Sequence, residues 1–196
     1  MVFWPRCGRY VAGYIMTLFP TENQQRLLVA HGLNRRFGAL WVSIADGYEV
    51  ARGLHFPVGT IETCDFQTAM RSYDPAGSAR RAWITPHTPG WSHVLLLSGG
   101  QASSAEELSR HGQRVFEISY VGGIEELDEP IYTYDGEYRS IFDEAAHEAH
   151  WTDLPNDDTM SIPETLDQFM IIIGRITGGF LDQNWISSEG LLCVMP

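Results

Sequence analysis

The densest run of side chains that could bind a metal ion is residues 143–150, which read Asp-Glu-Ala-Ala-His-Glu-Ala-His. In a helix, Glu144, His147 and His150 would project to one side, because residues three apart are neighbours on a helix surface. Di-metal helix bundles present Glu-x-x-His ligands at this spacing, whereas the zinc-protease motif places its second histidine one position later. Two readings follow, a metal site on these three residues and a solvated helix face whose histidines meet carboxylates. The spacing favours the solvated face.

Two histidines, His87 and His93, flank a segment rich in proline and glycine that includes Trp91. A histidine in a rigid loop can act as a general base if a carboxylate orients it. No Gly-x-Ser-x-Gly motif supplies a nucleophile, and Cys193 has no basic neighbour in sequence that would lower the pKa of its thiol. A catalytic role for His87 or His93 is one hypothesis, and a structural role, with His93 as a strand residue, is the favoured one.

Residues 94–110 have the order strand, glycine turn, helix, in which backbone amides can hold a phosphate. Glu106 and Glu107 lie in the first turn of that helix and would repel an anion. The segment also lacks Gly-x-Gly-x-x-Gly and the lysine of a P-loop. We therefore expect a structural turn and assign no cofactor-binding residue, so the cofactor is left unknown.

Aromatic side chains gather next to acidic ones between residues 131 and 151. The candidates for an interaction surface are Tyr132, Tyr134, Asp135, Tyr138 and Trp151. Aromatic residues rimmed by charge are typical of protein interfaces. They are equally typical of a small hydrophobic core, and the sequence favours the core.

Net charge narrows the partners that this chain can bind. The formal charge of its 196 residues is −12, all thirteen cations are arginines, and residues 106–167 hold seventeen acidic residues against three arginines. This balance disfavours nucleic acids and anionic membranes, since both are bound by neutralising their phosphates. Such a segment suits a basic protein partner or a metal ion, or it is a solvated face that keeps the protein soluble. The solvated face is again the favoured reading.

The elements that must position these residues are predicted from apolar periodicity and turn signals. Strands are expected at residues 10–19, 39–45, 48–54, 58–66, 79–85, 91–98, 114–121, 131–134 and 138–142. Helices are expected at residues 21–32, 103–110, 143–151 and 161–178. Asp46-Gly47 and Asp135-Gly136 are hairpin signals, although the arm before Asp46 could be helical. Ser103 with Glu106, and Ser161 with Glu164, form capping boxes.

These elements predict one α+β domain over residues 1–196, with an antiparallel or mixed β-sheet and a few flanking helices. Arg6 and Arg9 before an apolar run resemble a secretory signal, but no small-x-small cleavage site follows, which favours a buried first strand. Cys7, Cys64 and Cys193 are odd in number and far apart, a pattern typical of reduced thiols in a cytoplasmic protein.

Several short motifs carry a family resemblance. They are Tyr14-Ile-Met-Thr-Leu-Phe, His31-Gly-Leu, Gly90-Trp91 with its apolar strand, Leu97-Ser-Gly-Gly, residues 115–120, and Tyr134-Asp135-Gly136 ahead of Phe142. Together the motifs, over roughly residues 10–175, resemble a family of small actinobacterial proteins catalogued as a domain of unknown function. The resemblance implies a strand and helix, a Trp-bearing strand, a second strand and an Asp-Gly hairpin. The family's acidic residue after the tryptophan is absent here, and the family brings no activity.

Three hypotheses about function remain. The first is a binding protein whose residues 106–167 present an acidic, aromatic-bearing surface to a basic protein, as an immunity or antitoxin-type inhibitor would. The second is a small accessory or biosynthetic enzyme that uses His87 or His93, or a metal on Glu144, His147 and His150. The third is a structural subunit. The sequence does not settle the oligomeric state.

Overall fold

A computed structural model describes residues 19–98, 105–123, 127–155 and 160–195. Its strands are β1 (Arg36–Val42), β2 (Ile61–Asp65), β3 (Arg81–Thr88), β4 (Trp91–Leu96), β5 (Arg114–Val121), β6 (Ile131–Tyr134), β7 (Glu137–Ser140) and β8 (Glu189–Val194). Its α-helices are α1 (Gln24–Ala30), α2 (Gly47–Gly53), α3 (Phe66–Met70), α4 (Ala105–Leu108), α5 (Ile162–Thr177) and α6 (Gln183–Ile186). Two 3₁₀-helices, η1 (Val58–Thr60) and η2 (Ala145–His150), complete the set. The expected first strand, residues 10–19, lies almost wholly outside the described residues.

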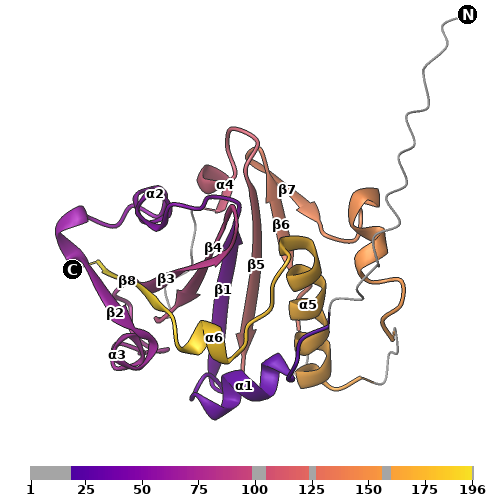
Figure 1. The fold of residues 1–196 in the computed structure, drawn as a ribbon, viewed down its shortest axis with the longest axis horizontal. Helices are drawn as coiled ribbons and strands as arrows, with labels where there is room; N and C mark the ends of the chain where they lie inside the picture. The colour runs from indigo at the N-terminus through magenta and orange to yellow at the C-terminus, as the bar shows by residue number, and fades with distance from the viewer. Residues whose placement is uncertain (1–18, 99–104, 124–126, 156–159, 196) are drawn as a thin grey trace, which may run out of the picture.

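The strands form one eight-stranded sheet in the order β2-β8-β3-β4-β1-β5-β6-β7. Every neighbouring pair is antiparallel, from β2 with β8 to β6 with β7. Figure 1 shows α5 and α6 lying across one face of this sheet, with α1 at the lower end. The α+β prediction, with an antiparallel sheet and flanking helices, is therefore confirmed.

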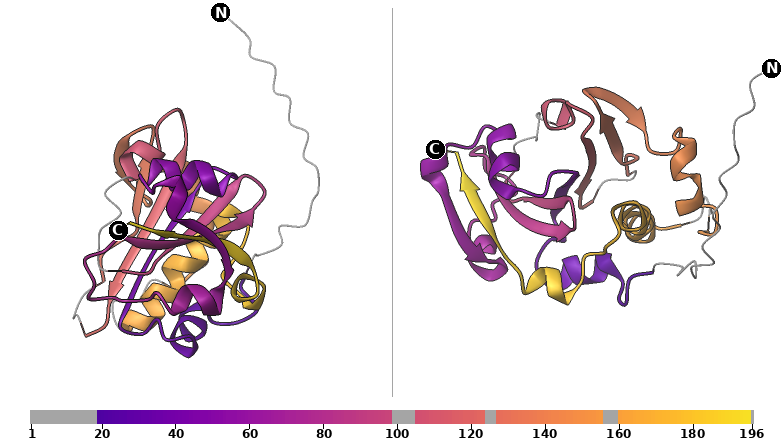
Figure 2. Two further views of the ribbon diagram at one scale, coloured as in Figure 1. Left: turned by 90° about the vertical axis from the view of Figure 1, so that its left-hand side faces the viewer. Right: turned by 45° about the horizontal axis from the view of Figure 1, so that its top comes forward.

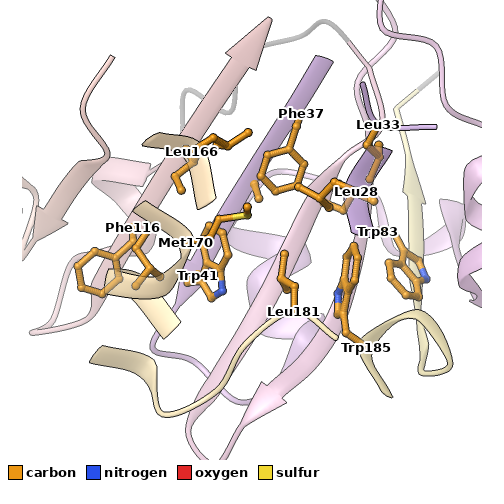
Figure 3. Close-up of a cluster of buried hydrophobic side chains, with 14 of the residues drawn as sticks. Leu28, Leu33, Phe37, Trp41, Trp83, Phe116, Leu166, Met170, Leu181 and Trp185 are labelled. Carbon is orange, nitrogen blue, oxygen red and sulfur yellow. The ribbon is translucent and has the colours of Figure 1, made fainter. Parts of the chain in front are cut away.

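Both faces of the sheet are buried, each against its own helices. On one face, side chains of β1, β3 and β5 meet α1, α3, α5 and α6 in the larger core cluster. Figure 3 shows its members, among them Trp41, Phe116, Met170 and Trp185, projecting into this layer. On the other face Val50 of α2 and Leu108 of α4 pack on the strands in a second cluster. The molecule therefore has three layers, which the two views of Figure 2 show from other sides.

Where local signals were strong, the predicted elements are confirmed. The strand expected at residues 114–121 is β5, and β6 and β7 form the expected hairpin. Its turn residues Asp135 and Gly136 have φ of 50° and 83°, the left-handed values that a two-residue hairpin requires. Helix α5 begins after Ser161, whose backbone N–H donates to Glu164, and ends at Gly178 with φ of 83°.

Three predictions of local structure are wrong. Asp46-Gly47 is not a hairpin turn: the Asp46 carboxylate accepts a hydrogen bond from the Tyr48 N–H at 2.9 Å and caps α2, so the expected second arm is a helix. The expected stiff loop after residue 85 is strand, because β3 continues through a bulge at residues 86–88 into a tight turn. The expected helix at residues 143–151 is the six-residue 3₁₀-helix η2, whose hydrogen bonds have poorer geometry than those of an α-helix.

Candidate functional site: an acidic aromatic groove

A groove opens beside the edge strand β7, between the segments that precede and follow η2 and helix α5. It has a volume of about 730 Å³. Its lining residues are Glu129, Ser140, Phe142, Asp143, Trp151, Leu154, Pro155, Met160, Thr165, Gln168, Phe169 and Ile172. Three are aromatic, two are carboxylic acids, and none of these described residues is basic. A concave surface of this size, lined by both polar and aromatic groups, can receive a side chain or a ligand.

Three half-buried aromatic rings form one wall of the groove. The Phe142 ring meets the Trp151 ring edge-on, with centroids 5.2 Å apart. It also contacts the Phe169 ring of α5, with centroids 6.2 Å apart. The three rings come from different segments, and Phe142 contacts both of the others, so its ring joins the two sides of the wall. The surface that they leave uncovered is therefore preorganised.

A buried arginine on α5 fixes the segment that carries Trp151. The guanidinium of Arg175 donates to the Asp153 carboxylate at 2.6 and 3.1 Å and to the His150 carbonyl at 2.9 Å. It also lies 4.4 Å from the centre of the Phe19 ring. These hydrogen bonds lower the pKa of Asp153, so the carboxylate stays ionised. The chain on both sides of Trp151 is thus tied to the helix that forms the opposite wall.

The two groove carboxylates differ from the other acidic residues nearby. Glu137 and Glu144 both bind the Arg139 guanidinium, at 3.1 and 2.9 Å. Glu129 accepts one long hydrogen bond, 3.5 Å, from the Ser140 hydroxyl. Within the described ranges, neither Glu129 nor Asp143 makes an ion pair, and both are exposed. Their negative charge is therefore presented to solvent at the groove.

A shallow depression of about 430 Å³ adjoins the groove and shares Glu129 and Ser140 with it. Tyr138 and Ile131 line this depression and are 60% and 41% exposed, high values for such large residues. Both come from the β6–β7 hairpin. Arg139 also lines it, and its guanidinium is engaged by Glu137 and Glu144. The groove and depression form one continuous surface, which we call the acidic groove face.

The structure divides the predicted interaction residues. Trp151 lines the groove and Tyr138 the adjoining depression. Tyr132 is a correction: it is 4% exposed and stacks on Phe116 in the core, because β6 turns it toward the helices. Tyr134 is half-buried under the Arg139 guanidinium. Asp135 lies in the hairpin turn, where its carboxylate accepts from the Gly112 N–H, and it lines neither hollow.

The proposed metal ligands do not form a site. Across the part of the chain that the structure describes, no three His, Cys, Asp or Glu side chains are grouped so that they could hold a metal ion. Glu144 is engaged by Arg139, and His147 is buried against the Tyr132 ring, with centroids 5.1 Å apart. Burial lowers the pKa of both His147 and His150. The 3₁₀ turn brings His147 into the core, so the three groups do not converge on one point.

The predicted catalytic histidines lie together, His93 fully buried and His87 partly buried. Their rings are 6.3 Å apart, and His93 is fully buried between the rings of Trp41 and Trp185. Burial lowers the pKa of His87 to about 4 and that of His93 well below its ordinary value. His87 Nε2 lies 3.0 Å from the Thr177 hydroxyl and 3.1 Å from the Gly179 carbonyl. A fully buried His93 cannot reach a substrate, so His93 is a residue of the core.

Of the aromatic and acidic residues that line the groove, only Trp151 was a predicted site residue; Glu129, Phe142, Asp143 and Phe169 were not. Phe169 stands on the apolar stripe of α5, where the sequence pattern reads it as core. Phe142 follows the hairpin, and the sequence pattern predicts a core residue there too. Their convergence depends on how η2 packs on α5, for which the sequence holds no local signal. The one available signal was the excess of acidic residues over residues 106–167.

Comparison with known proteins finds no matching family model, no matching curated protein and no matching solved structure. Among the described residues, no helix is both long and apolar enough to cross a membrane. The site is therefore interpreted from its own geometry.

Proposed function

We propose that this protein binds a basic protein partner through the acidic groove face. The observation that supports this most strongly is the composition of the groove: aromatic rings and unpaired carboxylates line it, and no cation among its described residues neutralises them. Oppositely charged surfaces steer association and select partners. A basic surface is therefore the chemistry that this face complements.

The exposed residues beside the groove extend the contact surface. Tyr138 and Ile131 line the depression together with Glu129, and Trp151 lines the groove together with the same residue. Interfaces commonly combine a central aromatic anchor with a polar rim. By this proposal Trp151 and Tyr138 supply contact area, while Glu129 and Asp143 supply charge complementarity.

A binder of this kind would act as an immunity or antitoxin-type inhibitor if the partner were a basic toxin or enzyme. In that role the acidic face would cover a basic substrate-binding surface. The enzyme alternative receives no support from the described residues, because His93 is buried, His87 is partly buried against Thr177 and Gly179, and the predicted metal ligands do not converge.

Capture from a cell extract, with a matched pair of variants, tests the proposal. Immobilised protein should retain basic proteins at about 0.05 M salt and release them at about 0.5 M, because added salt screens exposed charges. Glu129→Gln with Asp143→Asn should lose the captured protein. Glu62→Gln, on the distant edge strand β2, should retain it. Capture that ignores both the salt and the groove substitutions would contradict the proposal.

A further inference from the structure

The proposed function leaves open which group of the partner enters the groove. We propose that the groove binds an arginine side chain of the partner, with the guanidinium placed between the aromatic wall and the carboxylates of Glu129 and Asp143. This inference rests on the proposed function, since it names the anchor residue of the same interface.

The chain's own arginines show which surroundings a guanidinium adopts in this region. Arg175 lies over the ring of Phe19 and binds the carboxylate of Asp153 through two nitrogens. Arg139 lies 5.4 Å from the centre of the Tyr134 ring and binds both Glu137 and Glu144. Both sites combine an aromatic ring with carboxylate oxygens.

The groove contains the same two kinds of group. Its rings, Phe142, Trp151 and Phe169, are half-buried, and its carboxylates make no ion pair within the described residues. The arginines on either side are engaged elsewhere, Arg139 by Glu137 and Glu144, and Arg175 by Asp153. The groove therefore has the groups that surround an arginine but no cation of its own among the described lining residues.

Arginine fits these groups better than lysine does. Its planar guanidinium stacks on aromatic rings and donates to carboxylates in a fixed fork, whereas the ammonium of lysine is compact and strongly hydrated. Cation–π contacts are strongest with tryptophan, and the groove holds Trp151. The volume of about 730 Å³ also leaves room for the residues on either side of the arginine.

A titration of the intact protein with small probes tests the inference. N-acetyl-arginine methylamide is added to ¹⁵N-labelled protein, and the indole N–H signal of Trp151, assigned with Trp151→Phe, is followed by NMR. The matched probe is N-acetyl-citrulline methylamide, which has nearly the same shape without the charge. We expect a saturable shift for the arginine probe and about tenfold weaker binding of the citrulline probe, since hydrogen bonds to charged groups are stronger than neutral ones.

Variants separate the groove from general electrostatics. Glu129→Gln with Asp143→Asn should weaken the arginine probe about fivefold, as expected for exposed ion pairs, whereas Glu62→Gln should leave its affinity unchanged. Equal binding of the two probes, or shifts that avoid Trp151, would overturn the inference. The comparison of the two probes uses the wild-type protein, and Trp151→Phe serves only to assign the indole signal.

The outcomes also distinguish this inference from the proposed function. If a basic partner is captured through the groove carboxylates but the arginine probe leaves Trp151 unshifted, the function stands and the arginine anchor is wrong. If the probe binds at Trp151 but capture ignores salt and the groove substitutions, the arginine site stands and the proposed function fails.

Discussion

Replacing His93 by leucine tests the buried histidine cluster through the pH dependence of stability. The His93 ring is fully buried, and neither of its nitrogens has a hydrogen-bond partner in the structure. Leucine removes these unpartnered atoms and also the ring contacts with Trp41 and Trp185. The two effects oppose each other, so we expect the free energy of unfolding near neutral pH to change by less than about 1 kcal/mol.

Acidification should separate the variant from the wild type. Burial lowers the pKa of His93 well below 6.5, so the folded state keeps the ring neutral while the unfolded chain takes up a proton. Stability is then lost as the pH falls below the unfolded pKa, by about 2 kcal/mol for this one residue between about pH 7 and about pH 5. His93→Leu should avoid that loss. Glu117, whose pKa burial raises, acts in the opposite direction but equally in both proteins.

Urea unfolding at both pH values, followed by tryptophan fluorescence and circular dichroism, measures this difference. Thr85→Val is the matched control, because Thr85 pairs with His93 across β3 and β4, has an unpartnered buried hydroxyl, and does not titrate. Its stability should run parallel to that of the wild type between the two pH values. If the difference between His93→Leu and wild type were the same at both pH values, His93 could not be a neutral core residue.

Three further results are expected. Gly178→Ala should destabilise the protein by about 1 kcal/mol in urea unfolding, because Gly178 has φ of 83°. Gly59→Ala, where the space is equally open and φ is not positive, should change stability by less than about 0.5 kcal/mol, and equal effects of the two substitutions would contradict the left-handed cap. In the same assay, Tyr132→Ala should lower the free energy of unfolding by about 3 kcal/mol and Tyr138→Ala by less than about 0.5 kcal/mol, since only Tyr132 is buried. The reverse order would place Tyr132 at the surface. Iodoacetamide at about pH 8 should leave Cys193 unmodified in the folded protein and alkylate it in urea, because burial raises the pKa of this thiol to about 12. Peptide mass spectrometry measures the alkylation, and rapid alkylation of Cys193 in the folded protein would refute its burial.

Capping residues and glycines in the sequence correctly predicted the helix whose two ends they determine. Helix α5 has a capping box at Ser161 and a glycine at residue 178, and both act as the sequence indicates. The hairpin signal Asp-Gly was less reliable: Asp135-Gly136 forms the predicted hairpin turn, but Asp46-Gly47 begins helix α2 instead. An Asp-Gly pair suits a hairpin turn and a helix start alike. Tertiary packing decides between them, and at α2 it buries Val50 on the sheet.

The site was less predictable than the fold, because its residues converge only in three dimensions. The excess of acidic residues marked the segment that holds both groove carboxylates, and Trp151 and Tyr138 were among the predicted interaction residues. Alternation along β6 could not tell which side of the strand faces the helices, so Tyr132 stayed among the candidates for the interaction surface. Its place in the core agrees with the interpretation that the sequence favoured. Phe169 looked like a core residue because an apolar helix stripe reads the same whether it meets a core or a groove.

The most direct test of the acidic groove face is calorimetric titration of the captured basic partner with three proteins: wild type, Glu129→Gln with Asp143→Asn, and Glu62→Gln. We predict that wild type and Glu62→Gln bind with equal affinity, that the groove variant binds about tenfold or more weakly, and that the difference shrinks as salt rises from about 0.05 M to about 0.5 M. Equal affinity of all three proteins at low salt would contradict the account.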